Sequence, residues 1–162
     1  MSYQTLTLET DNHVATITLN RPEMMNAFSE QLIWDMGEAT KAVKDDSQIR
    51  ILIITGEGRG FTAGADLSER DASWTDTKDA LERGYYPFIK NIIDMPKPVI
   101  GSINGAAAGI GAAVAMACDL RIMAKEAYIM SVFSNIALVP DGGLSFLLTR
   151  EIGYSRALEY AI

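Results

Sequence analysis

The chain has 162 residues, a length that fits one domain with one core, and 48% of these residues are hydrophobic while 22% are charged. This composition is typical of an ordinary globular protein and excludes a disordered chain. The net charge of −7 argues against general binding to nucleic acid or to an anionic membrane, so an anionic ligand requires local positive charge.

The first quarter of the chain predicts a hairpin followed by a helix. Residues 6–8 and 14–19 alternate apolar and polar side chains on either side of the turn residues Asp11 and Asn12, which is typical of a β-hairpin. Ser29 then precedes apolar residues at helical spacing and has the side chain of a good N-cap. We therefore expect a helix over residues 30–44.

The middle of the chain predicts two strands joined by a helix. Residues 51–55 form a continuous β-branched apolar run that ends at glycines, which favours a strand buried on both faces. Residues 99–103 form a second such run, and the segment between the two runs predicts a helix over residues 77–94. The order strand, helix, strand indicates a parallel pair with a right-handed crossover.

The last third predicts short elements. We expect a helix at residues 112–117, strands at 120–123 and 128–130, and a helix that includes 144–150. The fold class is therefore α/β, in a single domain over residues 1–162. Residues 155–162 resemble a helix without a capping residue after it, so we expect the chain to be the N-terminal part of a longer protein.

The few cysteines and histidines and the short apolar runs argue against a disulfide-bonded, zinc-binding or membrane-spanning protein. Cys118 is the only cysteine, so no internal disulfide can form, and we expect a cytoplasmic protein. With His13 as the only histidine, no zinc spacing exists and no metal site is expected. Residues 1–10 lack the features of a secretory signal, and residues 106–118 are too short to span a bilayer, which needs about 20 residues.

Residues 58–67 form the first stretch that suggests chemistry, directly after a predicted strand. Its glycines allow a close approach of backbone to ligand. Gly58, Gly60 and Ala63 also satisfy a relaxed dinucleotide-binding pattern. Two features count against that alternative: the strand is not the first of the chain, and Glu82 lies in a predicted helix instead of at the end of a strand. A glycine-rich loop without a ligand is a further alternative.

Two later stretches also allow a structural and a functional interpretation. Residues 104–113 are small and lead into a helix, whose free N–H groups suit an oxyanion, although a tightly packed buried helix has the same composition. Residues 139–143 contain Pro-Asp-Gly, which is first of all a turn signature. Taken alone, Asp141 is a turn residue.

Taken in chain order, these stretches resemble the enoyl-CoA hydratase/isomerase (crotonase) family. The matching segments are RPxxxNA at residues 21–27, FxAGADL at 61–67, KPVIGSING at 97–105, which resembles the family's KPVIAAVNG, ACD at 117–119 and the glycine-rich turn at 140–143. The resemblance implies a spiral core of ββα units. It also implies that the C-terminal helical region of the family, which closes the acyl pocket and the trimer contact, is absent from this chain.

The resemblance also implies a binding site for an acyl-CoA thioester. The backbone N–H groups of Ala65 and Ile110 are expected to form the oxyanion hole. Residues expected to contact substrate or CoA are Arg21, Arg59, Ala63, Gly64, Asp66, Leu67 and Gly109, the two arginines near the phosphates. No cofactor is expected beyond the CoA of the substrate. The resemblance implies a homotrimer or a dimer of trimers, and we expect association through the sheet and the Ala/Gly-rich helix, with apolar surface left exposed.

The reaction type depends on which side chains move protons. Hydratases of the family carry two glutamates, and Ala113 and Phe133 occupy those positions here. Because hydration needs an acid and a base on one face, we favour an isomerase in which Asp141 is the single acid/base. An apolar surround of Phe133, Ile136 and Leu138 is expected to raise its pKa. A hydratase with an unusual base and a non-catalytic acyl-CoA-binding or assembly subunit are the alternatives.

Overall fold

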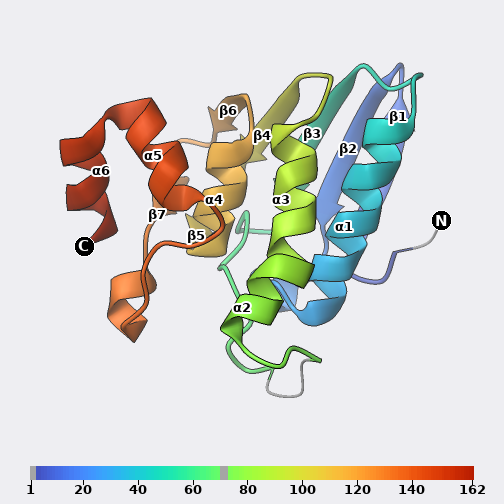
Figure 1. Cartoon of the computed structure of the whole chain (residues 1–162). Coiled ribbons are helices and arrows are strands. Elements are labelled where there is room, and N and C mark those ends of the chain that lie inside the picture. The colour runs from blue at the N-terminus through green and yellow to red at the C-terminus, as the bar shows by residue number, and fades with distance from the viewer. Residues whose placement is uncertain (1–2, 70–72) are drawn as a thin grey trace.

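Two sheets organise the chain, and the computed structural model describes residues 3–69 and 73–162 (Figure 1). The larger sheet contains, in spatial order, β1 (Leu6–Asp11), β2 (Val14–Leu19), β3 (Ile51–Gly56), β4 (Val99–Ile103) and β6 (Leu120–Met123). The strands β1 and β2 form an antiparallel hairpin, and every other neighbouring pair is parallel. The short strands β5 (Ala106–Ala108) and β7 (Tyr128–Met130) pair in parallel as a second sheet. The predicted α/β class, hairpin and parallel pair are confirmed.

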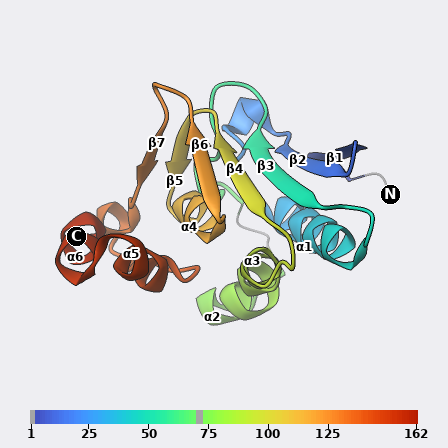
Figure 2. The ribbon, with the colours of Figure 1, turned by 90° about the horizontal axis from the view of Figure 1, so that it is seen from above.

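The helices lie mainly on one face of the larger sheet. They are α1 (Glu30–Asp45), α2 (Thr77–Asp79), α3 (Tyr86–Ile93), α4 (Ile110–Ala117), α5 (Leu144–Ile152) and α6 (Tyr154–Ala161), with a π-helical segment η2 (Ala80–Tyr85) and 3-10 turns η1 (Pro22–Met24) and η3 (Phe133–Ile136). Figure 2 shows α1, α3 and α4 side by side against the sheet, with α5 and α6 beyond α4. This arrangement places the start of α4 and the turn before α5 close to each other.

The first helix follows directly from its sequence. The Ser29 hydroxyl accepts a hydrogen bond of 3.2 Å from the N–H of Leu32, so α1 begins with the predicted N-cap. Leu32, Met36 and Val43 lie on one stripe and are fully buried. Burial of side chains of this size stabilises the fold by roughly 1.5–3 kcal/mol each.

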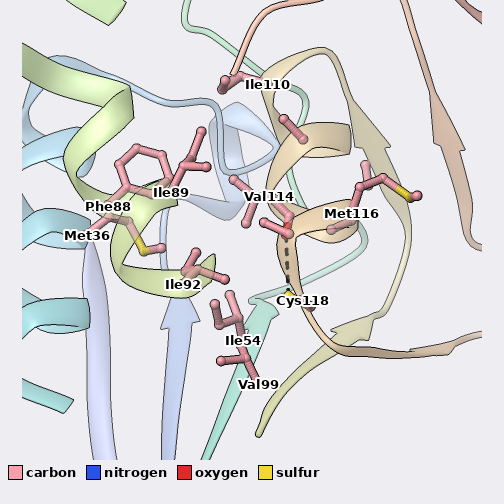
Figure 3. Packing of buried hydrophobic residues seen from close by; sticks show 14 of the residues in the cluster. Met36, Ile54, Phe88, Ile89, Ile92, Val99, Ile110, Val114, Met116 and Cys118 are labelled. Atoms are coloured by element: carbon pink, nitrogen blue, oxygen red, sulfur yellow. Dashed lines mark hydrogen bonds between the residues drawn. The ribbon is translucent and has the colours of Figure 1, made fainter. Parts of the chain in front are cut away.

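The core lies between the helices and the larger sheet. Figure 3 shows Phe88, Ile89 and Ile92 of α3 facing Val114 of α4, above the sheet. Cys118 belongs to the same cluster, and its Sγ donates to the carbonyl of Val114 at 3.3 Å. Burial raises the pKa of the Cys118 thiol, so this residue is a neutral packing group.

The prediction that residues 51–55 are buried on both faces is wrong for the isolated chain. Along β3, fully buried residues alternate with residues that are only half-buried. The reason is that α1, α3 and α4 cover one face of the sheet only (Figure 2). A continuous apolar run therefore does not show what covers the second face.

The predicted helix at residues 77–94 is confirmed, but its middle turn has an unexpected register. Over Ala80–Tyr85 the helix is of the π type, and the N–H of Tyr86 donates to the carbonyl of Leu81, five residues earlier. Pro87 follows at once and has no N–H with which to continue an α-helical ladder. The wider π turn accommodates the proline ring and places one extra residue in the helix.

The Ala/Gly-rich helix does not provide an association surface. All eight residues of α4 are buried within the chain itself, so that part of the trimer prediction is wrong. The expected exposed apolar surface is confirmed at β6 and β7, where it includes Leu120, Ile122 and Tyr128. Assembly as a trimer stays a prediction.

The surroundings of His13, possible metal ligands and the length of the helices bear on the remaining predictions. His13 is exposed, and its Nδ1 lies 2.8 Å from the carbonyl oxygen of Gln48. Over residues 3–69 and 73–162, no three His, Cys, Asp or Glu side chains are grouped so that they could hold a metal ion. Within the same ranges, no helix has the length and apolar character needed to cross a membrane.

Candidate active site

The glycine-rich loop after β3 is held by β5. The N–H of Thr62 donates to the carbonyl of Ala106 at 2.9 Å, and the N–H of Ala108 donates to the carbonyl of Thr62 at 3.0 Å. The buried Thr62 hydroxyl bonds the carbonyl of Asn26 at 2.7 Å and accepts from the N–H of Gly64 at 3.2 Å. These bonds fix the path of the loop where it passes β5.

The next residue, Ala65, offers a free backbone N–H. The carbonyl of Gly64 accepts from the N–H of Phe28 at 2.7 Å, and the N–H of Asp66 donates to the carbonyl of Phe28 at 3.0 Å. In such a parallel bridge the intervening residue directs its N–H to the opposite side. Among the described residues, the N–H of Ala65 has no hydrogen-bond acceptor.

A second free N–H lies beside the first. Ile110 is the first residue of α4, where N–H groups have no partner within the helix, and no other described residue accepts its N–H. The preceding Gly109 has a φ of 54° and is anchored by a bond of 3.1 Å from its N–H to the carbonyl of Met130. A Cβ added to Gly64 would lie 3.7 Å from the Cα of Gly109, so the two backbones are in contact. Ala65 and Ile110 therefore lie close together, with Ile110 at the positive end of the helix dipole, and binding of one oxygen by both N–H groups stays a prediction.

The third component is Asp141, on the turn before α5. Asp141, Ala65 and Ile110 all line one cavity of about 110 Å³. The turn is stabilised by a bond of 2.9 Å from the N–H of Leu144 to the carbonyl of Asp141. Gly142 has a φ of 58°, and a Cβ at this position would lie only 2.3 Å from the Cδ1 of Ile110. The turn is thus packed directly on the residue that supplies the second N–H.

The cavity around Asp141 is apolar. Phe133, Ile136 and Leu138 line it, as the sequence predicted, together with Val132. The Oδ1 atom of Asp141 is buried and has no hydrogen-bond partner in the described part of the chain. Burial raises the pKa of this carboxyl group to about 6, because the apolar surround disfavours the charged form. A carboxylate with this pKa is a stronger base than a solvated aspartate and remains ionised at neutral pH.

Arg21 and Asp66 form an ion pair that joins two of the sequence motifs. The guanidinium Nη2 of Arg21 lies 3.0 Å from the Oδ2 of Asp66, and its Nη1 donates to the carbonyl of Ala27 at 2.6 Å. The side chain of Asp66 is 5% exposed and that of Arg21 is 19% exposed. A hydrogen bond from the hydroxyl of Ser68 lowers the pKa of Asp66 below its ordinary value, and a hydrogen bond from Arg21 lowers it further. The pair holds residues 61–67 against residues 21–27.

The arrangement of two free N–H groups beside a desolvated carboxylate agrees with the comparison with protein families. The model of the family described as "Enoyl-CoA hydratase/isomerase" matches residues 9–162. The chain belongs to this family. The resemblance noted in the sequence motifs is therefore confirmed.

Relatives in the enoyl-CoA hydratase/isomerase family carry different activities in their names. The chain is 42% identical, over 92% of its length, to 1,2-epoxyphenylacetyl-CoA isomerase of Escherichia coli, of which it covers 58%. It is 37% identical, over its whole length, to a probable enoyl-CoA hydratase of Rhodobacter capsulatus, of which it covers 62%. The solved structure of enoyl-CoA hydratase from Bacillus anthracis superposes with a TM-score of 0.91 at 32% identity, over 98% of this chain and 62% of that one. The crotonase fold is confirmed, and the chain spans about 60% of the length of these relatives.

The two positions at which hydratases of the family carry glutamates are apolar here and lie at the site. Phe133 is buried and lines the cavity. Ala113 is buried in α4, and a Cβ on Gly142 would lie 3.0 Å from its Cβ. Asp141 is the only carboxylate that lines the cavity within the described residues.

The structure divides the predicted CoA contacts into two groups. Ala63, Gly64, Leu67 and Gly109 line the cavity, and Leu67 is 70% exposed at its rim. The side chains of Arg21 and Asp66 already bond to each other. Arg59 is exposed, so its guanidinium is accessible to a phosphate. We expect Arg59 to contact CoA and Arg21 to act through the loop that it supports.

Paired substitutions of the two arginines separate these roles. Arg21→Ala leaves the carboxylate of Asp66 buried without its cation, so the free energy of unfolding is expected to fall by about 3 kcal/mol. Arg59→Ala at the exposed position is expected to change it by less than about 0.5 kcal/mol while weakening the affinity for CoA. Denaturant unfolding and calorimetry measure the two quantities. Equal stability of both variants would contradict the structural role of Arg21.

Two residues of the site escaped the sequence analysis. Asn26 is fully buried, and its Nδ2 donates to the carbonyls of Glu57 and Gly60, both at 2.9 Å. These bonds stabilise the glycine-rich loop after β3. The place of Asn26 in the RPxxxNA motif was the available signal. Tyr85 lines the same cavity as Asp141, and burial, followed by the charge of Asp141, raises the pKa of its phenol. An aromatic residue on a predicted helix resembles an ordinary core residue, so nothing in the sequence marked it.

The dinucleotide-binding alternative is wrong. That fingerprint requires a helix to begin at the glycines, yet the described residues 61–69 form a loop with isolated bridges. Glu82 lies in the π-helical segment instead of at the end of a strand. The glycines serve close packing instead: an added Cβ would lie 3.1 Å from the Cβ of Pro22 at Gly58 and 2.8 Å from the Cε of Met25 at Gly60.

Proposed function

We propose that the protein is an acyl-CoA isomerase that moves a double bond from C3 to C2 of an enoyl-CoA thioester. The observation that carries this proposal is the position of Asp141, which among the described residues is the only carboxylate in a cavity that Ala65 and Ile110, with their free N–H groups, also line. One carboxylate is sufficient for a reaction in which a single proton leaves one carbon and returns to another.

The proposed reaction proceeds through a thioester enolate. The thioester oxygen accepts hydrogen bonds from the N–H groups of Ala65 and Ile110. Asp141 takes the proton from C2, the electron pair of the C2–H bond forms a double bond between C1 and C2, and the π pair of the carbonyl moves onto the oxygen, where the two donors stabilise the charge. The protonated Asp141 then delivers the proton to C4, where the π pair of the former C3–C4 double bond binds it. The C1–C2 π pair becomes the double bond between C2 and C3, and the negative charge on the oxygen restores the carbonyl. No water or external acid takes part.

The arrangement also supports an isomerase over a hydratase. Addition of water requires one group that activates the water and another that protonates carbon. Ala113 and Phe133 supply neither, and burial and the charge of Asp141 keep the phenol of Tyr85 protonated, so it is no base. A relative at 42% identity carries the name of an isomerase. A non-catalytic acyl-CoA binder would lack any use for the desolvated carboxylate.

The pH dependence of the rate tests this proposal. Because the base form of Asp141 is required and its pKa is about 6, log kcat/KM for a 3-enoyl-CoA is expected to rise with unit slope up to about pH 6 and then to level off. Absorbance of the conjugated product measures the rate, and addition of water to a 2-enoyl-CoA is measured in parallel. Faster hydration than isomerisation would overturn the assignment, and binding of acyl-CoA without either reaction would favour a binding subunit.

A further inference from the structure

The described residues that line the cavity of Asp141 include only two polar side chains, those of Asp141 and Tyr85. The Oδ1 of Asp141 is a buried acceptor to which no described residue donates. The hydroxyl of Tyr85 is its counterpart, because no group in the described part of the chain forms a hydrogen bond with it. The proposed reaction uses the carboxylate of Asp141 but gives the hydroxyl of Tyr85 no partner.

Aromatic packing holds the ring of Tyr85 in place. Its centroid lies 6.2 Å from that of Phe28, at an interplanar angle of 66°, and 6.1 Å from that of Phe88. Phe28 and Phe88 stack on each other with their centroids 5.4 Å apart. Because the three rings support one another, the hydroxyl of Tyr85 keeps a fixed place and cannot turn away to reach a partner elsewhere.

The hydroxyl of Tyr85 is a neutral donor on the side of the cavity where Asp141 lies. Burial raises the pKa of this phenol, and the charges of Asp141, Glu69 and Asp66 raise it further, with Asp141 the largest of the three. The phenol therefore keeps its proton at neutral pH. A hydrogen bond from it to Asp141 would lower the pKa of the carboxyl group and weaken the base, and the structure has no such bond.

A bound acyl group would cover this donor and remove it from water. A hydrocarbon chain offers the hydroxyl no acceptor, and a buried donor left unpaired weakens binding by about 5- to 150-fold. The thioester oxygen is not the missing acceptor, because in the proposed reaction it is bound by the N–H groups of Ala65 and Ile110. An oxygen atom further along the acyl group would pair with the hydroxyl, and a site of this kind selects the ligand that carries it.

We infer that Tyr85 binds an acceptor oxygen attached to C4 or C5 of the acyl group, which makes acyl-CoA thioesters with an oxygenated acyl group the substrate class. The inference rests on the proposed function, since that function places the thioester at Ala65 and Ile110 and the carbons C2 to C4 at Asp141. A hydroxyl on the side of Asp141 then lies beside C4 and the carbon that follows it. The cavity of about 110 Å³ has room for few further atoms.

Affinities of saturated thioesters test the inference without any turnover. Calorimetry compares 4-oxohexanoyl-CoA with 4-methylhexanoyl-CoA, and 5-oxohexanoyl-CoA with 5-methylhexanoyl-CoA, so that a methyl group replaces the oxygen within each pair. Tyr85→Phe is expected to lower the ratio of oxo to methyl affinity at least fivefold for one pair or both, the effect of one buried donor. The variant keeps the ring that packs on Phe28 and Phe88, and circular dichroism checks that it is folded.

The matched control is Tyr86→Phe, which removes the same hydroxyl from the neighbouring residue. Tyr86 is 60% exposed, so its substitution is expected to leave both ratios unchanged within twofold. A fall of less than fivefold for both pairs in Tyr85→Phe would overturn the inference. An equal fall in Tyr86→Phe would overturn it as well, since the effect would then not depend on the cavity.

The outcomes also separate the role of Tyr85 from the proposed reaction. A ratio that depends on Tyr85, in a protein that does not isomerise a 3-enoyl-CoA, would support the recognition of oxygen and reject the reaction. Isomerisation by a protein whose ratios do not depend on Tyr85 would support the reaction and overturn the recognition. A protein that binds none of the four thioesters would overturn both.

Discussion

Asp141→Asn is expected to slow isomerisation of a 3-enoyl-CoA by about 100- to 10,000-fold, while the affinity for acyl-CoA stays nearly unchanged. Asparagine has the size of aspartate and leaves the backbone bond from Leu144 to residue 141 in place. Its amide cannot accept a proton from C2. The rate is measured by absorbance, exchange of the C2 proton by incubation in deuterated solvent, and affinity by calorimetry.

A matched control is Asp46→Asn, which makes the same change in an exposed aspartate. Within the part of the chain that the structure describes, the side chain of Asp46 accepts only from the N–H of Gln48, at 2.8 Å, so no effect on the rate is expected. If Asp141→Asn exchanged the C2 proton and isomerised substrate at the rate of the wild type, Asp141 would be a plain turn residue. The base would then have to be sought elsewhere.

Asp141→Asn is also expected to change the free energy of unfolding. Denaturant unfolding measures this change and tests at the same time whether the variant is folded. The pKa of Asp141 is raised in the folded protein, so the folded state binds more protons than the unfolded state between about pH 4 and pH 6. Stability therefore falls as pH rises through this window, and the penalty persists above it. Asp141→Asn removes the penalty, so the variant is expected to be more stable than the wild type by about 1 kcal/mol at pH 8, after allowance for solvent screening, and equally stable below pH 4.

Gly64→Val is expected to reduce kcat/KM by about 100- to 1,000-fold, the loss that follows removal of one oxyanion donor. Gly64 has a φ of 97°, and a Cβ would lie 2.8 Å from the carbonyl oxygen of Ala108. Valine forces the loop away from β5, and the N–H of Ala65 moves with it. Because the loop also lines the cavity, acyl-CoA binding is expected to weaken as well, which calorimetry measures.

Gly153→Val separates this effect from backbone strain. Gly153 has a similar φ of 79°, but a Cβ there meets no atom within 4 Å, and the residue lies between α5 and α6. Both variants carry the strain of a β-branched residue in the left-handed region, about 1–3 kcal/mol. Only Gly64→Val is expected to lose activity. Wild-type affinity and rate in a folded Gly64→Val protein, as judged by circular dichroism, would show that the loop does not form the site.

The helices and strands that the sequence predicted well are those in which apolar residues recur at regular spacing. Residues 14–19 alternate in burial along β2, and the apolar spacing after Ser29 matches the buried stripe of α1. The strand β5 was missed because three successive alanines carry no alternating pattern. The π-helical register was missed because the apolar spacing of a helix does not encode its hydrogen bonds, although Pro87 was a signal of a break.

The sequence predicted the parts of the candidate site that the backbone forms. It predicted less well which side chains contact each other across the site. Glycines and a helix start marked Ala65 and Ile110, and the structure brings both to the cavity of Asp141. The type of residue alone could not show that Arg21 pairs with Asp66, 45 residues away, instead of with a phosphate. Such a contact depends on two loops that the sheet brings together.

The two proposed oxyanion donors belong to the main chain, and this makes them unusually resistant to mutation. Every residue except proline supplies an N–H, so nearly any substitution at positions 65 and 110 keeps the donors while the surrounding backbone holds its path. The proton-transferring groups are side chains, and one codon change removes any of them. A lineage built on this fold can therefore exchange the residues at 113, 133 and 141, and with them the reaction, while it retains the means of stabilising an enolate.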